Sequence, residues 1–170
     1  MDSAEENVLF TVITKKPEET FAWGERLAGY LFPGAVIALS GELGAGKTLF
    51  AQGIAKGLNI TEPITSPTFT IINEYHQGRL PFFHIDAYRL EEAGEVEELG
   101  LEEYFNSSGV TLIEWPEQIK GFLPLSYLKI NLKKEWDEFG HELRRLSFKD
   151  MGHEWENLIR EFKESENIRN

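Results

Sequence analysis

The sequence predicts an α/β fold in which buried strands alternate with helices. One observation is the apolar run Ala35–Leu39, which precedes a glycine-rich loop and then apolar residues spaced by four, a succession typical of strand, loop and helix. A second is that two further β-rich runs, Leu80–Ile85 and Val110–Ile113, are each followed by a carboxylate. Strands followed by acidic residues are expected at the ligand-binding edge of an α/β sheet.

The glycine-rich loop, Gly41–Thr48, reads G-x-x-x-x-G-K-T, the phosphate-binding loop of P-loop nucleotidases. Its three glycines allow the backbone to approach phosphate oxygens, and its N–H groups form an anion nest at the start of a helix. In this pattern Lys47 reaches the β- and γ-phosphates, and the Thr48 hydroxyl binds Mg²⁺. The alternative is a glycine-rich turn that happens to precede a helix, but the full spacing and both flanks favour a nucleotide site.

Length and composition favour one cytoplasmic domain over residues 1–170. The chain has no cysteine, which excludes disulfides, thiolate metal sites and cysteine nucleophiles. Met1–Glu6 is acidic and lacks the apolar core of a signal peptide, and no apolar run approaches the length of a membrane span. The net charge of −12 is unfavourable for direct binding of nucleic acid, so any role in RNA metabolism is expected to act through a protein partner.

The first part of the chain is expected to form two helices beside two strands. Val8–Thr14 is rich in β-formers, and a helix is expected to start near Pro17 with acidic residues in its first turn. Pro33 and Gly34 stop that helix, and the strand Ala35–Leu39 follows. The helix that starts near Lys47 is expected to end near Gly57.

The middle of the chain is expected to form a hairpin and two short helices. Phe69–Tyr75 and Leu80–Ile85 are rich in β-formers and are separated by a turn that contains Gly78. Leu90–Phe105 has helical spacing with a break at Gly100.

The last part is expected to form a helical turn, two antiparallel strands and a helix. The turn runs from Pro116 to Gly121, and the strands are Leu125–Leu132 and Glu142–Phe148. Gly152–Phe162 carries an apolar stripe, interpreted as core, and the polar residues 163–170 are expected to fray.

Asp86 and Glu114, the two carboxylates that follow strands, are candidates for chemistry. Either one could bind Mg²⁺ or orient an attacking water molecule, and the pattern alone does not decide between them. The structural alternatives for these two carboxylates are a helix N-cap and a surface ion pair.

Several nearby polar residues allow a structural and a functional interpretation. Ser66 and Thr68 flank Pro67 and would suit a switch that senses the γ-phosphate, although composition alone favours an ordinary X-Pro turn. Arg89 either faces the phosphates or pairs with the acidic residues after it. His84 shares a strand face with Asp86, and we interpret it as a hydrogen-bonded core histidine in preference to a catalytic one.

Together these segments resemble one family, TsaE (YjeE), over about residues 17 to 148. The resemblance rests on Ser66–Thr70 with Asn73–Tyr75, on His84–Leu90, on Ile113–Glu117, on Gly24–Ala28 and on the order of these segments around Gly41–Thr48. It implies a three-layer P-loop nucleoside triphosphate hydrolase fold, with a parallel sheet core flanked by antiparallel strands.

The resemblance also implies a function. TsaE proteins are bacterial ATPases required for threonylcarbamoyladenosine formation on tRNA, at the adenosine next to the anticodon. They bind the TsaB–TsaD dimer and contact tRNA only indirectly, and the synthase TsaC supplies threonylcarbamoyl-adenylate. Hydrolysis of ATP is thought to reset the complex between turnovers; it is weak for TsaE alone and is stimulated by the partners.

By the same resemblance, each motif has a role in binding ATP and Mg²⁺. Thr48 and Glu114 are the Mg²⁺ ligands, which leaves Asp86 to position water and act with Lys47 in catalysis. Ser66 and Thr68 form the switch. The nucleotide-binding residues are Gly44, Ala45, Gly46, Lys47, Thr48 and Leu49 at the phosphates, with Thr20, His141 and Arg144 as candidates at the adenine end.

Three other functions compete with a partner-stimulated ATPase. A small-molecule kinase would need an acceptor pocket and an arginine-rich lid, and the sequence suggests neither. A GTPase would need the tetrapeptide N-K-x-D, which does not occur. A nucleotide-gated adaptor, in which ATP binding alone changes partner affinity and hydrolysis is incidental, remains an alternative.

Overall fold

The structure is a computed structural model that describes residues 7–169. Met1–Glu6, which are not expected to form a signal peptide, therefore lie outside the described residues. Within them the elements are β1 (Val8–Thr14), α1 (Pro17–Ala28), β2 (Val36–Gly41), α2 (Lys47–Gly57), β3 (Ile72–Tyr75), β4 (Phe82–Asp86), α3 (Ala93–Glu98), α4 (Leu101–Phe105), β5 (Val110–Glu114), the 3₁₀ helix η1 (Pro116–Phe122), β6 (Tyr127–Trp136), β7 (Glu142–Met151) and α5 (Glu156–Arg169).

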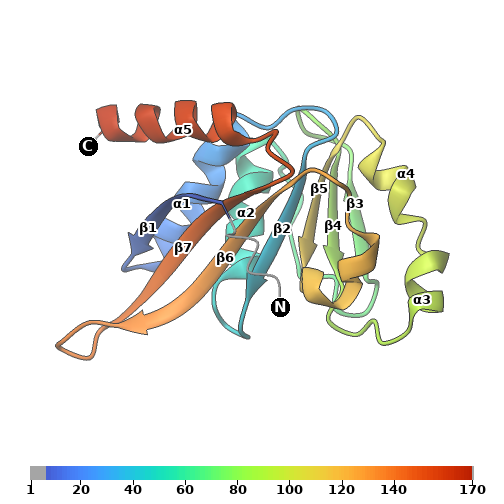
Figure 1. Cartoon of the computed structure of the whole chain (residues 1–170), viewed down its shortest axis with the longest axis horizontal. Coiled ribbons are helices and arrows are strands. Elements are labelled where there is room, and N and C mark those ends of the chain that lie inside the picture. The colour runs from blue at the N-terminus through green and yellow to red at the C-terminus, as the bar shows by residue number, and fades with distance from the viewer. Residues whose placement is uncertain (1–6, 170) are drawn as a thin grey trace.

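The described strands form one sheet in the order β1-β7-β6-β2-β5-β4-β3 (Figure 1). The four central strands, β6, β2, β5 and β4, pair in parallel. Antiparallel pairs flank them on both sides, with β7 and β1 beyond β6 and with β3 beyond β4. The parallel core flanked by antiparallel strands, expected from the family resemblance, is thereby confirmed.

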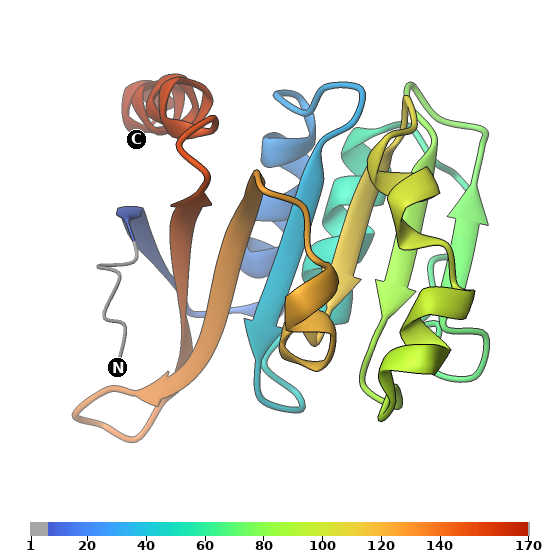
Figure 2. The same ribbon diagram turned by 45° about the vertical axis from the view of Figure 1, so that its right-hand side comes forward.

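Helices cover both faces of this sheet and give the three layers. Figure 2 shows α1 and α2 behind the sheet and η1, α3 and α4 in front of it. Each face has its own buried cluster, because successive side chains of a strand point to opposite faces. In β5, for example, Leu112 belongs to the cluster under α1 and α2, and Ile113 belongs to the cluster under α3 and η1.

Helices α1 and α2 pack closely because glycines lie at their contact. A Cβ added at Gly53 would lie 2.1 Å from the carbonyl oxygen of Phe21, and one at Gly24 would lie 2.4 Å from that of Phe50. These oxygens are backbone atoms, so a larger residue would force the helices apart. This packing fixes the start of α2, and so the phosphate-binding loop, against the rest of the fold.

Replacing Gly53 with alanine is expected to lower the free energy of unfolding by about 3 kcal/mol, since overpacking against backbone cannot be relieved by a side-chain rotation. Gly94→Ala is the matched control, because Gly94 also lies in a helix and an added Cβ there meets nothing within 4 Å. It should leave stability unchanged or raise it slightly. Urea unfolding of both variants measures the difference, and equal midpoints would contradict the packing argument.

Several boundaries differ from those expected. Phe69–Ile71 is not part of β3, because Ile71 has φ of 66° and donates its N–H to the Pro67 carbonyl oxygen at 2.8 Å, closing a turn. Strands β6 and β7 are longer than expected and include Trp136 and Met151. Helix α1 ends at Ala28, before the Pro33–Gly34 stop.

The C-terminal residues expected to fray are helical as far as Arg169. Helix α5 is held at both ends of its described part, because Trp155, Ile159 and Phe162 are buried in the main core and Glu166 pairs with Arg26 at 2.6 Å. The apolar stripe is therefore core, as expected. Among residues 7–169, no helix has the length and apolar character needed to cross a membrane.

Candidate functional site

The phosphate-binding loop joins the end of β2 to the start of α2. Gly44 has φ of 76° and Gly46, which caps α2, has φ of 105°. Both values lie in the left-handed region that favours glycine, so the loop needs glycine at these positions. Ala45 donates its N–H to the Glu42 carbonyl oxygen at 3.1 Å, which closes the turn inside the loop.

Arg144 of β7, a strand in the antiparallel part of the sheet beyond β6, forms hydrogen bonds with this loop. Its Nε donates to the Ala45 carbonyl oxygen at 3.0 Å and its Nη2 donates to that of Gly44 at 3.2 Å. Across a trans peptide the N–H of Gly46 lies opposite to the Ala45 carbonyl. This N–H therefore points away from Arg144, as a phosphate-binding nest needs.

Lys47 lies in the mouth of the loop. Its Nζ donates to the carbonyl oxygens of Gly41 and Glu42, and it lies 4.0 Å from the centre of the Trp115 ring. Burial lowers the pKa of Lys47, although the carboxylates of Glu114 and other acidic residues oppose this shift. Trp115 has φ of 60°, a strained value for a bulky residue, and this turn directly follows the end of β5.

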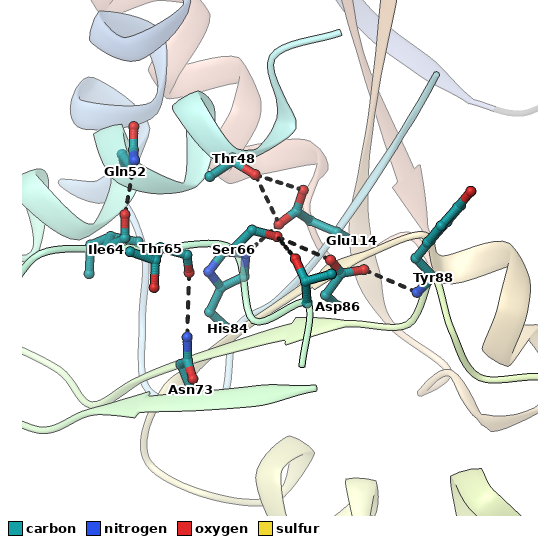
Figure 3. Close-up of polar contacts among 11 residues, drawn as sticks. Thr48, Gln52, Ile64, Thr65, Ser66, Asn73, His84, Asp86, Tyr88 and Glu114 are labelled. Atoms are coloured by element: carbon teal, nitrogen blue, oxygen red, sulfur yellow. Dashed lines mark hydrogen bonds and ion pairs between the residues drawn. The ribbon is translucent and has the colours of Figure 1, made fainter. Parts of the chain in front are cut away.

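Glu114, at the end of β5, is almost completely buried and forms hydrogen bonds with two side chains, those of Thr48 and His84 (Figure 3). The Thr48 hydroxyl lies 3.3 Å from Oε1 and 3.5 Å from Oε2, and Nε2 of His84 lies 2.6 Å from Oε2. A hydroxyl and a carboxylate oxygen are ligands that Mg²⁺ accepts in proteins.

Asp86, at the end of β4, lies beside Glu114 because the two residues are partners in the parallel register of β4 and β5. Its Oδ2 accepts a hydrogen bond from the Ser66 hydroxyl at 3.1 Å, and its Oδ1 accepts one from the Tyr88 N–H at 3.0 Å (Figure 3). The Thr68 hydroxyl donates in turn to that of Ser66 at 3.4 Å. Asp86 therefore joins the predicted switch to the end of the sheet.

The segment that carries Ser66 and Thr68 is tethered from both sides. Gln52 of α2 donates to the Ile64 carbonyl oxygen at 2.9 Å, and Asn73 of β3 donates to that of Thr65 at 3.4 Å (Figure 3). Beyond these tethers Phe69 is 87% exposed and its ring lies 4.9 Å from the guanidinium carbon of Arg89. The segment is thus fixed at its start, at Ile64 and Thr65, and has an exposed tip.

These residues enclose a pocket of about 360 Å³. It is lined by the loop residues Leu43, Gly44, Gly46, Lys47, Thr48 and Leu49 and by Ser66, Thr68, Asp86, Tyr88, Arg89, Glu114 and Trp115. The described residues contain no group of three or more histidine and acidic side chains with which protein alone would hold a metal.

A second pocket, of about 270 Å³, lies on the other side of the loop. Its lining includes Thr20 and Arg144, two of the residues expected at the adenine end, together with Lys15 and Lys16. His141, the third expected residue, is not part of either lining. It lies in the turn between β6 and β7, is exposed, and its Nδ1 lies 3.2 Å from Oδ2 of Asp137. The nucleotide contact expected of His141 therefore stays a prediction.

Sequence reasoning missed two features of this site. It gave Arg144 a place near adenine but not its bonds to the loop, and it treated His84 as core without its bond to Glu114. Both contacts join residues that are 30 or more positions apart. No local pattern signals them, because they depend on which strands become neighbours.

Comparison with known proteins places this site in a family. A family model described as "Threonylcarbamoyl adenosine biosynthesis protein TsaE" matches residues 14–145. The chain belongs to the TsaE family. The resemblance inferred from the sequence motifs is thereby confirmed, and the TsaE family serves the biosynthesis of threonylcarbamoyladenosine on tRNA.

Individual TsaE relatives match over most of the chain. The "tRNA threonylcarbamoyladenosine biosynthesis protein TsaE" of Bacillus subtilis (strain 168) is 45% identical, over 92% of this chain and 96% of its own length. The protein of that name from Treponema pallidum (strain Nichols) is 40% identical, over 71% and 89% of the two lengths. A solved structure titled "Crystal structure of Bacillus subtilus YdiB" superposes with a TM-score of 0.80 at 39% identity, covering 92% of this chain and 95% of the other.

Proposed function

We propose that the chain is a Mg²⁺-dependent ATPase that binds the TsaB–TsaD complex and supports threonylcarbamoyladenosine formation on tRNA, by resetting that complex between turnovers. The observation that carries the ATPase proposal is the meeting of Thr48 with Glu114 at the phosphate-binding loop, with Asp86 adjacent. A hydroxyl at the loop and a carboxylate at the end of a neighbouring strand are the usual protein ligands of Mg²⁺ in P-loop enzymes.

Each residue has a defined task in this proposal. The N–H of Gly46 and the ammonium of Lys47 bind the phosphates, and Thr48 and Glu114 hold Mg²⁺. When bound, Mg²⁺ neutralises charge on the phosphoryl oxygens. Asp86 orients the attacking water and accepts its proton, while its bonds to Ser66 and to the Tyr88 N–H keep the carboxylate in place.

The charge of the chain supports an indirect route to tRNA. A net charge of −12 disfavours contact with a polyanion, so we propose that TsaB and TsaD bind the tRNA and that this chain acts on them in the cytoplasm. Hydrolysis by the chain alone is expected to be weak, since a stabilising group supplied by a partner is worth about 10³–10⁵ in rate in related phosphoryl transfers.

Two experiments test this proposal. Capture of purified TsaB–TsaD by the tagged chain, with and without Mg·ATP, tests the partner, and failure to bind in either condition would overturn that part. Modification of tRNA through many cycles on a slowly hydrolysed ATP analogue would instead show a nucleotide-gated adaptor. A halt after a single cycle on the analogue, with many cycles on ATP, is the result expected of an ATPase.

Arg144→Ala is expected to weaken ATP binding about tenfold, because removing two charged hydrogen bonds frees the carbonyls of Gly44 and Ala45 and with them the orientation of the loop. Arg145→Ala is the matched control, since the neighbouring Arg145 binds the exposed Glu135 and touches no part of the loop in the described contacts. Titration with a fluorescent ATP analogue compares the two. Equal affinities would show that Arg144 does not orient the loop.

A further inference from the structure

His84 is buried beside the carboxylate that the proposed function assigns to Mg²⁺. Its side chain is fully buried in β4, and its Nε2 lies 2.6 Å from Oε2 of Glu114. The strand register explains the contact. His84 is the partner of Leu112 in β5, and side chains two residues apart on a strand share a face, so Glu114 is the diagonal neighbour of His84.

The surroundings of Nδ1, the other ring nitrogen of His84, indicate which of the two nitrogens carries the proton. Nδ1 is buried and has no hydrogen-bond partner among residues 7–169. A proton on Nδ1 would bury an unsatisfied N–H and would place two acceptors, Nε2 and Oε2 of Glu114, 2.6 Å apart. The favoured arrangement therefore carries the proton on Nε2, which donates it to Oε2 of Glu114.

This hydrogen bond restricts how Glu114 can turn. With Oε2 bound to His84, rotation of the carboxylate would break a buried, charge-assisted hydrogen bond. The other oxygen, Oε1, is then left nearest to the Thr48 hydroxyl, at 3.3 Å.

We propose that His84 is a positioning residue, which holds the Glu114 carboxylate in the orientation that binds Mg²⁺. The inference rests on the proposed function, since it assumes that Glu114 is a ligand. Partners that orient metal-ligating carboxylates contribute about 10- to 100-fold to metal affinity. Nothing in this role requires His84 to touch the nucleotide or the metal.

Two variants of similar size and polarity test the role of His84. In His84→Gln the side-chain amide nitrogen takes the place of Nε2 and can donate to Glu114. In His84→Asn the amide nitrogen takes the place of Nδ1 and cannot reach it. The measurement is binding of a fluorescent ATP analogue by the full chain, first without divalent cation in the presence of EDTA, and then over a series of Mg²⁺ concentrations.

We expect His84→Gln to keep the Mg²⁺ half-saturation of the unaltered chain within about threefold, and His84→Asn to raise it about tenfold or more. Binding in EDTA should be the same for all three proteins. A purely structural role for His84 would weaken binding in EDTA as much as in Mg²⁺, and that result would overturn the proposal. Equal half-saturation for Gln and Asn would do so as well.

The effect of Mg²⁺ on ATP binding by the unaltered chain separates a failure of this proposal from a failure of the proposed Mg²⁺ site on which it rests. If Mg²⁺ does not strengthen ATP binding by the unaltered chain, the proposed Mg²⁺ site itself is wrong. If Mg²⁺ strengthens binding equally in the unaltered chain and in both variants, the Mg²⁺ site stands and the role of His84 is wrong.

Discussion

Lys47→Ala is expected to lower the affinity for ATP by about 10²–10⁴. The reason is that, in the proposed function, the Lys47 ammonium would donate hydrogen bonds to two phosphates, and each charged hydrogen bond contributes about 1.5–3 kcal/mol. Thr48→Ala should lose Mg²⁺-dependent turnover for the related reason that one metal ligand is missing. Calorimetric titration with Mg·ATP measures both losses.

Lys56→Ala is the control for Lys47, because Lys56 lies on the same helix but is exposed and is 3.8 Å from Glu25. It should bind ATP normally and melt at the same temperature.

The lowered pKa of Lys47 also predicts the direction in which ATP affinity changes with pH. ATP affinity of the unaltered chain should fall as pH rises through that lowered pKa, and so at a lower pH than for an ordinary lysine. Normal binding by Lys47→Ala would refute the phosphate site.

Asp86→Asn is expected to keep ATP binding and to lose about 10²–10⁴ in the rate of hydrolysis, the range that general acid–base groups contribute. Asparagine has the same shape and can still accept the hydrogen bond of the Tyr88 N–H, but it cannot take a proton from water. Hydrolysis should be measured in the presence of TsaB and TsaD, where we expect it to be fastest.

Asp137→Asn controls for the loss of one negative charge, since Asp137 lies in the distant turn between β6 and β7 and binds only within that turn in the described contacts. It should hydrolyse ATP at the normal rate. Asp86→Asn that turns over normally with both partners present would show that water is positioned by another group, and Arg89 or a residue of the partner would then be the next candidate.

The strands and the phosphate-binding loop could be predicted from the sequence because their signals are local. The apolar run before Gly41 and the spacing up to Thr48 contain the whole motif, and Asp86 and Glu114 follow their strands directly. That both acids lie at the carboxyl ends of strands, at the ligand-binding edge, was expected from the fold class. That β4 and β5 are neighbours, which brings the two acids together, is seen only in the structure.

Of the features that could not be predicted, one is a local turn and the others depend on contacts between distant segments. Phe69–Ile71 is rich in β-formers, but Ile71 closes a turn with Pro67, which local propensity does not reveal. Residues 163–169 are polar enough to fray, yet Glu166 pairs with Arg26 of α1 and keeps the helix in place. Similarly, Arg144 reaches the loop only because β7 pairs with β6 and β6 pairs with β2.

The pairing of Asp86 with Glu114 across β4 and β5 fixes the distance between the two backbone positions that carry these acids. Adjacent strands lie about 4.7–4.9 Å apart, and this spacing comes from backbone hydrogen bonds that no side-chain substitution alters. The distance between the backbone positions of Glu114, the proposed metal ligand, and Asp86, the proposed water-binding acid, is thus set by the sheet. Substitutions around the two acids would leave this distance unchanged, and in the proposed function a partner that activates the site would have to fit it.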